Sequence, residues 1–130
     1  MTIKHVLNPE RIRRIPAQFS WVDHRLVQEQ YLQRCDPHAA ALYLFLVTVA
    51  DARGLSYYSD VILARCLSMV PDRMRLARDD LIRLGLIAYK HPLYQVLSLD
   101  MPPHQEVLKL GADEIRARID QLHSTLGRAP

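Results

Sequence analysis

The sequence is poor in glycine and cysteine and has no long apolar run. Its four glycines form neither a GxGxxG nor a P-loop pattern, so no loop for the phosphates of a nucleotide is predicted. The two cysteines, Cys35 and Cys66, form no CxxC pair and predict small core residues in a thiol-reducing compartment. The longest apolar stretch covers only residues 39–50, whereas a membrane span requires roughly 18 residues. Because the first residues also lack an apolar leader, we expect a cytoplasmic protein with no membrane contact.

Catalytic and metal-binding patterns are also missing from the sequence. The six histidines form neither an HExxH nor an HxxxH pattern, and no GxSxG nucleophile pattern occurs. The adjacent acidic pairs Asp79–Asp80 and Asp113–Glu114 are more typical of solvated helix faces than of a site for Mg²⁺. We therefore expect a protein that is not an enzyme and needs no metal or cofactor.

The formal net charge of +3 is unevenly distributed along the chain. Most of the basic excess lies in residues 1–20, which carry Lys4, Arg11, Arg13 and Arg14 and one acid, Glu10. We interpret this segment as a basic N-terminal arm. A mild positive excess indicates a preference for polyanions but does not identify one.

Apolar spacing and capping residues predict one folded domain over residues 21–103, followed by a C-terminal amphipathic helix and tail over residues 104–130. Asp36–Pro37, Ser59 and Pro71–Asp72 are typical of helix starts, and Gly54 and Gly85 are predicted to end their helices as left-handed caps. The inner face of the helix over 71–84 is predicted to hold the residues at i, i+3, i+7 and i+10: Met74, Ala77, Leu81 and Leu84. The predicted order is a helix over 21–34, an apolar helix over 36–53, a short strand over 55–58, a helix over 59–67, a turn over 68–70, a helix over 71–84, and strands over 86–90 and 93–99.

This order from residue 36 to residue 99 resembles the winged-helix variant of the helix-turn-helix. A three-residue turn separates a short helix from a longer one, as in that motif. The stretch LIRLGLIAYK, residues 81–90, is similar to the exit from the third helix in many bacterial winged-helix proteins. The resemblance covers about half of the chain. It implies a mainly α fold with a small β-hairpin wing, a winged helix-turn-helix with extra N- and C-terminal helices.

The chain also resembles the winged-helix modules of bacterial replication initiators and of regulators carried by mobile elements. That resemblance implies double-stranded DNA as the partner, with the helix over residues 71–84 in the major groove and the hairpin against the backbone or minor groove. Arginine suits this task because its planar fork can bind a guanine edge or a phosphate. The candidate DNA-binding residues are Arg73, Arg75, Arg78 and Arg83 in the helix, Lys90 and His91 at the hairpin tip, and Arg11, Arg13 and Arg14 in the arm.

The acids of the same helix leave a second interpretation open. Asp72, Asp79 and Asp80 nearly cancel its four arginines, and the spacing of Asp79 and Arg83 predicts an ion pair along the helix. Each arginine therefore fits a solvated helix face equally well.

Apolar residues favour a protein partner instead of DNA. Leu76 is predicted on the outward face of the helix, and six aromatic residues exceed what a small core easily hides: Phe19, Trp21, Tyr31, Tyr43, Tyr57 and Tyr58. The alternative function is a protein-interaction subunit of a larger replication, recombination or defence complex. In either case we expect a homodimer that forms through the helices over residues 21–34 and 112–126.

Overall fold

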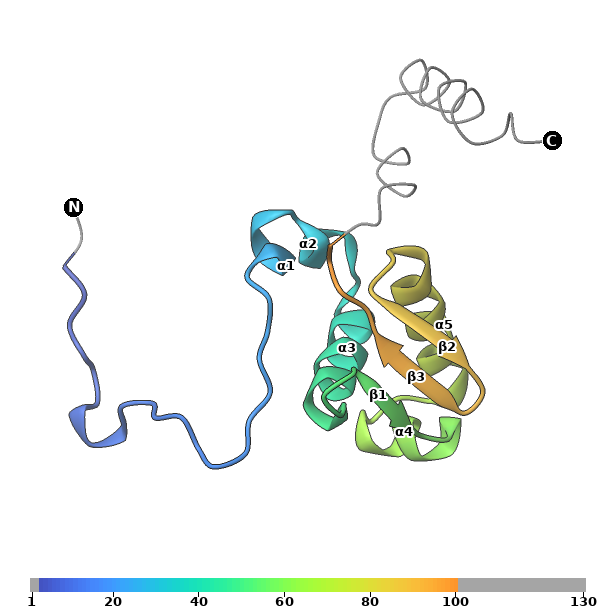
Figure 1. Ribbon diagram of the computed structural model, residues 1–130, viewed down its shortest axis with the longest axis horizontal. Coiled ribbons are helices and arrows are strands. Elements are labelled where there is room, and N and C mark those ends of the chain that lie inside the picture. Colours follow the sequence, from blue (N-terminus) through green and yellow to red (C-terminus); the bar gives the residue numbers. More distant parts are fainter. Residues whose placement is uncertain (1–2, 101–130) are drawn as a thin grey trace, which may run out of the picture. The chain divides into compact units, whose positions relative to one another are not determined.

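The computed structural model describes residues 3–100 of the chain, as short helices and a small antiparallel sheet (Figure 1). All helices and strands belong to one unit that ends at Val96, and the described residues 97–100 belong to a second unit. The expected C-terminal helix lies outside the described residues. In chain order the elements are the 3-10 turn η1 (Pro9–Arg11), α1 (Arg25–Gln28), α2 (Tyr31–Arg34), α3 (Pro37–Val49), β1 (Leu55–Tyr57), α4 (Asp60–Cys66), α5 (Pro71–Arg83), β2 (Ile87–Lys90) and β3 (Leu93–Val96).

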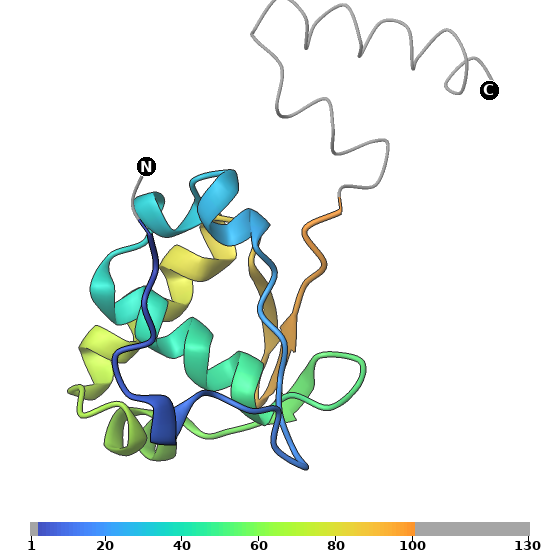
Figure 2. The same cartoon turned by 90° about the vertical axis from the view of Figure 1, so that its left-hand side faces the viewer.

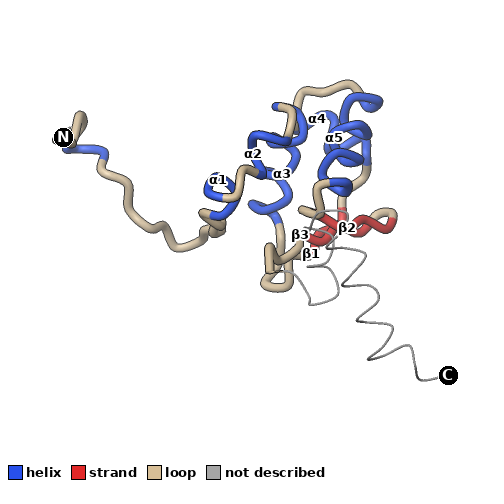
Figure 3. The backbone as a smooth tube through the Cα atoms, turned by 90° about the horizontal axis from the view of Figure 1, so that it is seen from above, coloured by secondary structure: helices blue, strands red, loops and turns tan. Residues whose placement is uncertain are grey.

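The core lies between α3, α5 and the sheet, and the prediction that both cysteines belong to it is wrong: Cys35 is half-buried and Cys66 is exposed. Met74, Ala77 and Leu81 are fully buried, which confirms three of the four residues predicted for the inner face of α5; Leu84 is half-buried. They pack towards α3, whose Leu42 and Leu46 are also fully buried. Figure 3 shows the three strands together on one side of α4 and α5.

The sheet has three strands in the order β1-β3-β2, and both pairings are antiparallel. The sequence predicted the hairpin of β2 and β3 but not the pairing of β1 with β3. Gly54 makes this pairing possible: its φ is +86°, and its carbonyl accepts a hydrogen bond of 2.8 Å from the Val96 N–H. Figure 2 shows the hairpin nearly edge-on beside the helices.

Most of the predicted helix caps are confirmed. Asp36 Oδ1 accepts a hydrogen bond of 2.8 Å from the Ala39 N–H at the start of α3. Ser59 Oγ accepts one of 3.3 Å from the Ile62 N–H at the start of α4. The chain leaves α5 through Gly85, whose φ is +75°.

Two helix predictions are wrong in part. The single helix expected over residues 21–34 is two short helices, because Gln30 adopts a left-handed φ of 63° between them. Its buried residues, Leu26 and Tyr31, are five positions apart and would face different directions on a continuous helix. In addition, α3 ends at Val49 rather than near residue 53, since the Asp51 carboxylate accepts bonds from the N–H groups of Arg53 and Leu55 and holds a turn instead. The prediction that Gly54 caps this helix is therefore wrong.

Candidate nucleic-acid interface

The outward face of α5 is the first part of the candidate interface. A short turn after α4 precedes this helix, and Ser68 in the turn has a φ of 55°. Opposite the buried residues, α5 exposes Asp72, Arg75, Leu76, Asp79 and Arg83. The outward position predicted for Leu76 is confirmed, since 57% of it is exposed. Two acids and two arginines leave this face without net charge.

Arg75 has the loosest ion pairs of the arginines on this face. One of its Nη atoms contacts the largely exposed carboxylate of Asp72, and the other lies 3.8 Å from Asp60 Oδ2. Its side chain is 45% exposed. Ion pairs between solvated groups contribute only about 0–1 kcal/mol, so Arg75 can exchange a carboxylate for a phosphate at small cost.

Arg83 is more exposed but has a structural partner. Its side chain is 71% exposed, whereas the Asp80 carboxylate that it contacts is only 13% exposed. The predicted pair of Asp79 with Arg83 is therefore replaced by an Asp80–Arg83 pair, three residues apart. Arg83 compensates a largely buried negative charge, and a substitution there would disturb the helix as well as the surface.

Arg73 points from α5 to the start of α3. Its Nη2 lies 2.6 Å from Asp36 Oδ2, and the same carboxylate caps α3 through its other oxygen. The hydrogen bond from the Ala39 N–H and the nearby guanidinium hold the pKa of Asp36 below its ordinary value. Arg73 thus joins two helices, and a contact with DNA would compete with that ion pair.

Arg78 is removed from the candidate surface by its burial. Only 8% of it is exposed, and its Nη1 donates hydrogen bonds to Asp60 Oδ1 at 2.7 Å and to the Tyr94 hydroxyl at 3.0 Å. Burial acts to lower the pKa of Arg78, but the bonds to Asp60 and Tyr94 outweigh it and raise that pKa. Arg78 is therefore a charged residue of the interior, not a side chain available to contact DNA in this structure.

The hairpin tip is the second part of the candidate interface. Lys90 and His91 are both exposed there. The hydroxyl of Tyr89 lies 3.1 Å from His91 Nδ1, so the imidazole is held against the strand that precedes it. The hairpin therefore places one lysine and one oriented histidine at its end.

The arm is the third part and carries most of the charge. All described residues from Ile3 to Val22 are exposed, including Arg11, Arg13 and Arg14. Ile12 and Ile15, which lie among these arginines, are exposed as well. Apart from the turn η1, the arm has no regular structure, and the arginines are available to an external anion.

Exposed apolar side chains are abundant in the same region. Among residues 3–100, ten large ones lie between Ile3 and Leu32: Ile3, Val6, Leu7, Ile12, Ile15, Phe19, Trp21, Val22, Val27 and Leu32. Of the six aromatics noted in the sequence, Phe19, Trp21 and Tyr57 are exposed, Tyr31 and Tyr43 are buried, and Tyr58 packs edge-on against Phe45. Three of the six aromatic residues therefore lie outside the core, as the sequence predicted for part of this set.

Sequence reasoning missed the inner partners of the arginines. Asp60 lies 18 residues before Arg78, and Asp36 lies 37 residues before Arg73, so no local pattern could pair them. Sequence reasoning also assigned no site residue to α4, although this helix precedes α5 and exposes Val61, Ile62 and Arg65.

Comparison with known proteins adds no further assignment. No family model, curated protein or solved structure matches the chain. In the part of the chain that the structure describes, no group of three acidic, histidine or cysteine side chains could hold a metal ion. Residues 3–100 also contain no helix with the length and apolarity that a bilayer crossing demands.

Proposed function

We propose that this protein binds double-stranded DNA as a winged helix-turn-helix, with α5 as the recognition helix and the β2–β3 hairpin as the wing. The observation that carries the proposal is the construction of α4 and α5. A short helix and a longer helix follow each other through a brief turn, and the longer helix buries one face and exposes Arg75, Leu76 and Asp79. A helix of this kind fits the major groove of DNA, where side chains of its exposed face reach base edges.

The arm and the hairpin support the same function. Phosphate contacts supply most of the sequence-independent affinity for DNA, and they require cations that are exposed. Arg11, Arg13 and Arg14 meet this requirement in the arm, and Lys90 meets it at the hairpin tip. An extended basic arm is suited to the minor groove or to the backbone beside a bound helix. The cellular process would be transcriptional or replication control of a mobile element, and the binding unit a homodimer.

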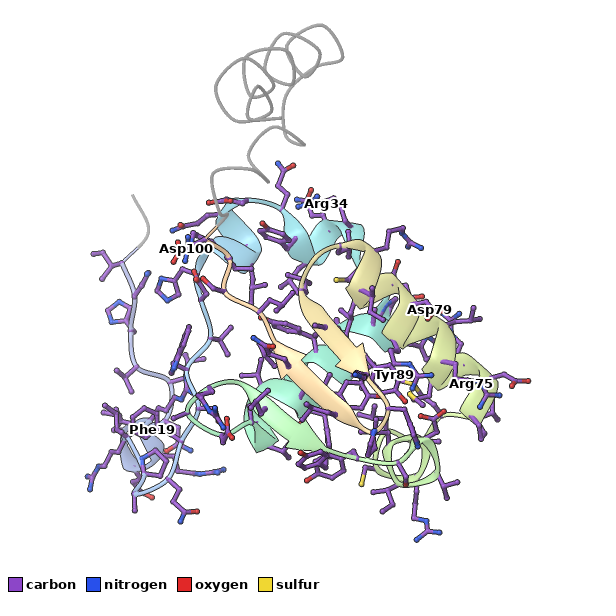
Figure 4. All side chains as sticks on the ribbon, turned by 45° about the vertical axis from the view of Figure 1, so that its right-hand side comes forward. Phe19, Arg34, Arg75, Asp79, Tyr89 and Asp100 are labelled. Atoms are coloured by element: carbon purple, nitrogen blue, oxygen red, sulfur yellow. The ribbon has the colours of Figure 1, made fainter. Side chains whose placement is uncertain are left out.

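The test is fluorescence anisotropy of a labelled random duplex, titrated with the full chain at about 50 and 200 mM salt. Arg75→Gln is the variant of choice because Arg75 contacts only carboxylates that are at least partly solvated. Arg34→Gln is the matched control, since it removes the same charge from α2, far from Arg75 in Figure 4. Both proteins must show the same far-ultraviolet spectrum and the same melting temperature as the wild type.

We expect micromolar binding that weakens by roughly tenfold or more between the two salt concentrations. Arg75→Gln should weaken binding and lower the slope of log affinity against log salt by about 1, while Arg34→Gln should leave both nearly unchanged. Absence of binding at about 50 mM salt would refute the proposal. Equal effects of the two variants would refute the assignment of α5 as the recognition helix.

A second candidate function, a protein-interaction subunit, is favoured by the ten exposed apolar side chains between Ile3 and Leu32. A large exposed apolar surface commonly marks a protein contact. Such binding would depend little on salt, because it releases no counterions. The discriminating variant is Phe19→Ser/Trp21→Ser, which removes apolar surface and no charge. It should leave DNA affinity unchanged if the arm acts through its arginines, and it should abolish a contact that depends on apolar area.

A further inference from the structure

Arg78 joins four elements through one guanidinium group. It belongs to α5, and its Nη1 donates to Asp60 Oδ1 at 2.7 Å in α4 and to the Tyr94 hydroxyl at 3.0 Å in β3. Its Cζ lies 4.2 Å from the ring centroid of Tyr89 in β2. Arg78 therefore links the proposed recognition helix to the helix before it and to both strands of the hairpin.

The contacts continue from Arg78 to the hairpin tip. The Tyr89 ring packs on the Tyr94 ring with centroids 4.5 Å apart, and its hydroxyl lies 3.1 Å from His91 Nδ1. Figure 4 shows Tyr89 on the hairpin next to α5. A change in the direction of the Arg78 guanidinium would therefore be transmitted to the residues beside Lys90.

The contacts also continue from Arg78 to the outward face of α5. Asp60 binds Arg78 through Oδ1, and its Oδ2 lies 3.8 Å from Nη1 of Arg75. One carboxylate thus faces the buried arginine on one side and the exposed arginine on the other. The orientation of Asp60 helps to determine where Arg75 is held.

Stability alone does not account for a charged residue at this position. Replacing both partners of a buried ion pair together by well-packed apolar residues is often neutral or stabilising, so stability does not by itself require a charged pair at this place. A planar guanidinium adds direction, because its N–H groups bind partners only along fixed lines. Arg78 directs its N–H groups at Asp60 and Tyr94, and the flat face of its guanidinium lies over the ring of Tyr89.

We propose that Arg78 is a positioning residue that holds the hairpin tip and Arg75 in the relative placement needed to contact one DNA duplex together. This inference rests on the proposed function. Arg78 itself touches no DNA; it acts through Tyr89 on the tip and through Asp60 on Arg75. Without Arg78 the two contacts become independent, and the tip loses its place beside the DNA backbone.

The experiment measures whether Lys90 contributes to binding in the presence and absence of Arg78. Lys90→Gln is combined with the wild type, with Arg78→Met and with Tyr94→Phe, and the salt dependence of duplex binding is measured for each full chain. Tyr94→Phe removes only the hydroxyl that accepts from Arg78, so it carries the test if Arg78→Met does not fold. Arg34→Gln serves as the charge control in every background.

In the wild type, Lys90→Gln should lower the salt slope by about 1, as expected for one lost phosphate contact. In Arg78→Met and Tyr94→Phe, the same change should have little effect on the slope. A residue with a merely structural role would lower the melting temperature and leave the Lys90 contribution intact.

The outcomes separate this inference from the proposed function. If the wild type binds and Lys90→Gln lowers the slope equally in all backgrounds, Arg78 does not position the tip and the inference is overturned. It is also overturned if Lys90→Gln has no effect in the wild type, because the tip then makes no contact. If the wild type does not bind the duplex at about 50 mM salt, the proposed function fails first, and the inference fails with it.

Discussion

Gly54 and Gly85 form a matched pair for testing how the sheet is held together. Both adopt a positive φ, +86° and +75°, that costs a residue with a side chain about 1–2 kcal/mol. A Cβ added at Gly85 would meet nothing within 4 Å. A Cβ added at Gly54 would lie 2.6 Å from the Val96 carbonyl oxygen, which is closer than real contacts allow.

The two alanine variants should therefore differ in stability. In each, alanine also restricts the unfolded chain, which offsets about 0.4–1 kcal/mol of the strain. Gly85→Ala should lose only about 1 kcal/mol or less. In Gly54→Ala the Val96 carbonyl must move, which adds about 1–3 kcal/mol of overpacking, and the hydrogen bond from the Val96 N–H to the Gly54 carbonyl, worth about 1 kcal/mol, is weakened. We expect Gly54→Ala to be less stable than Gly85→Ala by about 2–3 kcal/mol.

Thermal and urea unfolding, followed by circular dichroism at 222 nm, measure this difference. At about 4 °C for each kcal/mol, Gly54→Ala should melt roughly 8–12 °C below Gly85→Ala. Equal melting temperatures would show that the close approach of Gly54 to β3 does not exist in solution. The reasoning about the third strand would then be refuted, because β1 meets β3 through this residue.

Three further predictions concern the core, a helix cap and the arm. Leu81→Ala removes a fully buried side chain between α5 and α3 and should cost about 2–5 kcal/mol in urea unfolding; a loss below about 1 kcal/mol would mean that this face is not the core. Asp36→Ala should cost about 1 kcal/mol at pH 7, where the carboxylate caps α3 and contacts Arg73. The pKa of Asp36 is lowered in the folded state, so the unfolded state binds more protons in acid. The stability that the Asp36 carboxylate contributes is therefore complete above about pH 4 and disappears as the pH falls through the folded-state pKa. A difference in stability between wild type and Asp36→Ala that persists at about pH 2 would contradict this. Residues 3–15 have no buried side chain, so deletion of residues 1–15 should leave the urea midpoint unchanged while lowering the salt slope of DNA binding by about 3. A clear loss of stability would show that the arm packs on the domain.

Local sequence signals were sufficient for the parts of the fold that depend on neighbouring residues. Asp36 before Pro37, Ser59 before α4 and Pro71 at the start of α5 were identified because a cap and its helix lie within a few positions. The inner face of α5 followed from helical spacing alone. The break at Gln30 was missed because the apolar residues on both sides of it recur at helical spacing. Spacing alone does not show which of these residues reach the core.

Contacts between distant residues could not be predicted in the same way. The pairing of β1 with β3 joins Leu55 to Gln95 across 40 positions, and only the folded chain brings these strands together. The same holds for Asp60 and Arg78. On a helical wheel Arg78 lies at the flank of α5, between the buried and exposed faces, where a long side chain can turn either way. Its direction is decided by an acid on another helix and by two tyrosines on the hairpin.

If the protein binds DNA as proposed, the contacts made by the four arginines of α5 determine which part of the chain supplies the affinity. Arg78 is buried and Arg73 contacts Asp36, so only Arg75 and Arg83 remain on the outward face, together with Asp72 and Asp79. On this face, which has no net charge, Arg75 accounts for a salt slope of only about −1, whereas three exposed arginines in the arm imply a slope of about −2.7 if each contacts one phosphate. The arm would therefore supply most of the affinity, and α5 with the hairpin tip would supply the placement. Under this division of roles, truncating the arm weakens binding to every duplex alike, whereas Arg75→Gln weakens binding most at sequences that α5 recognises.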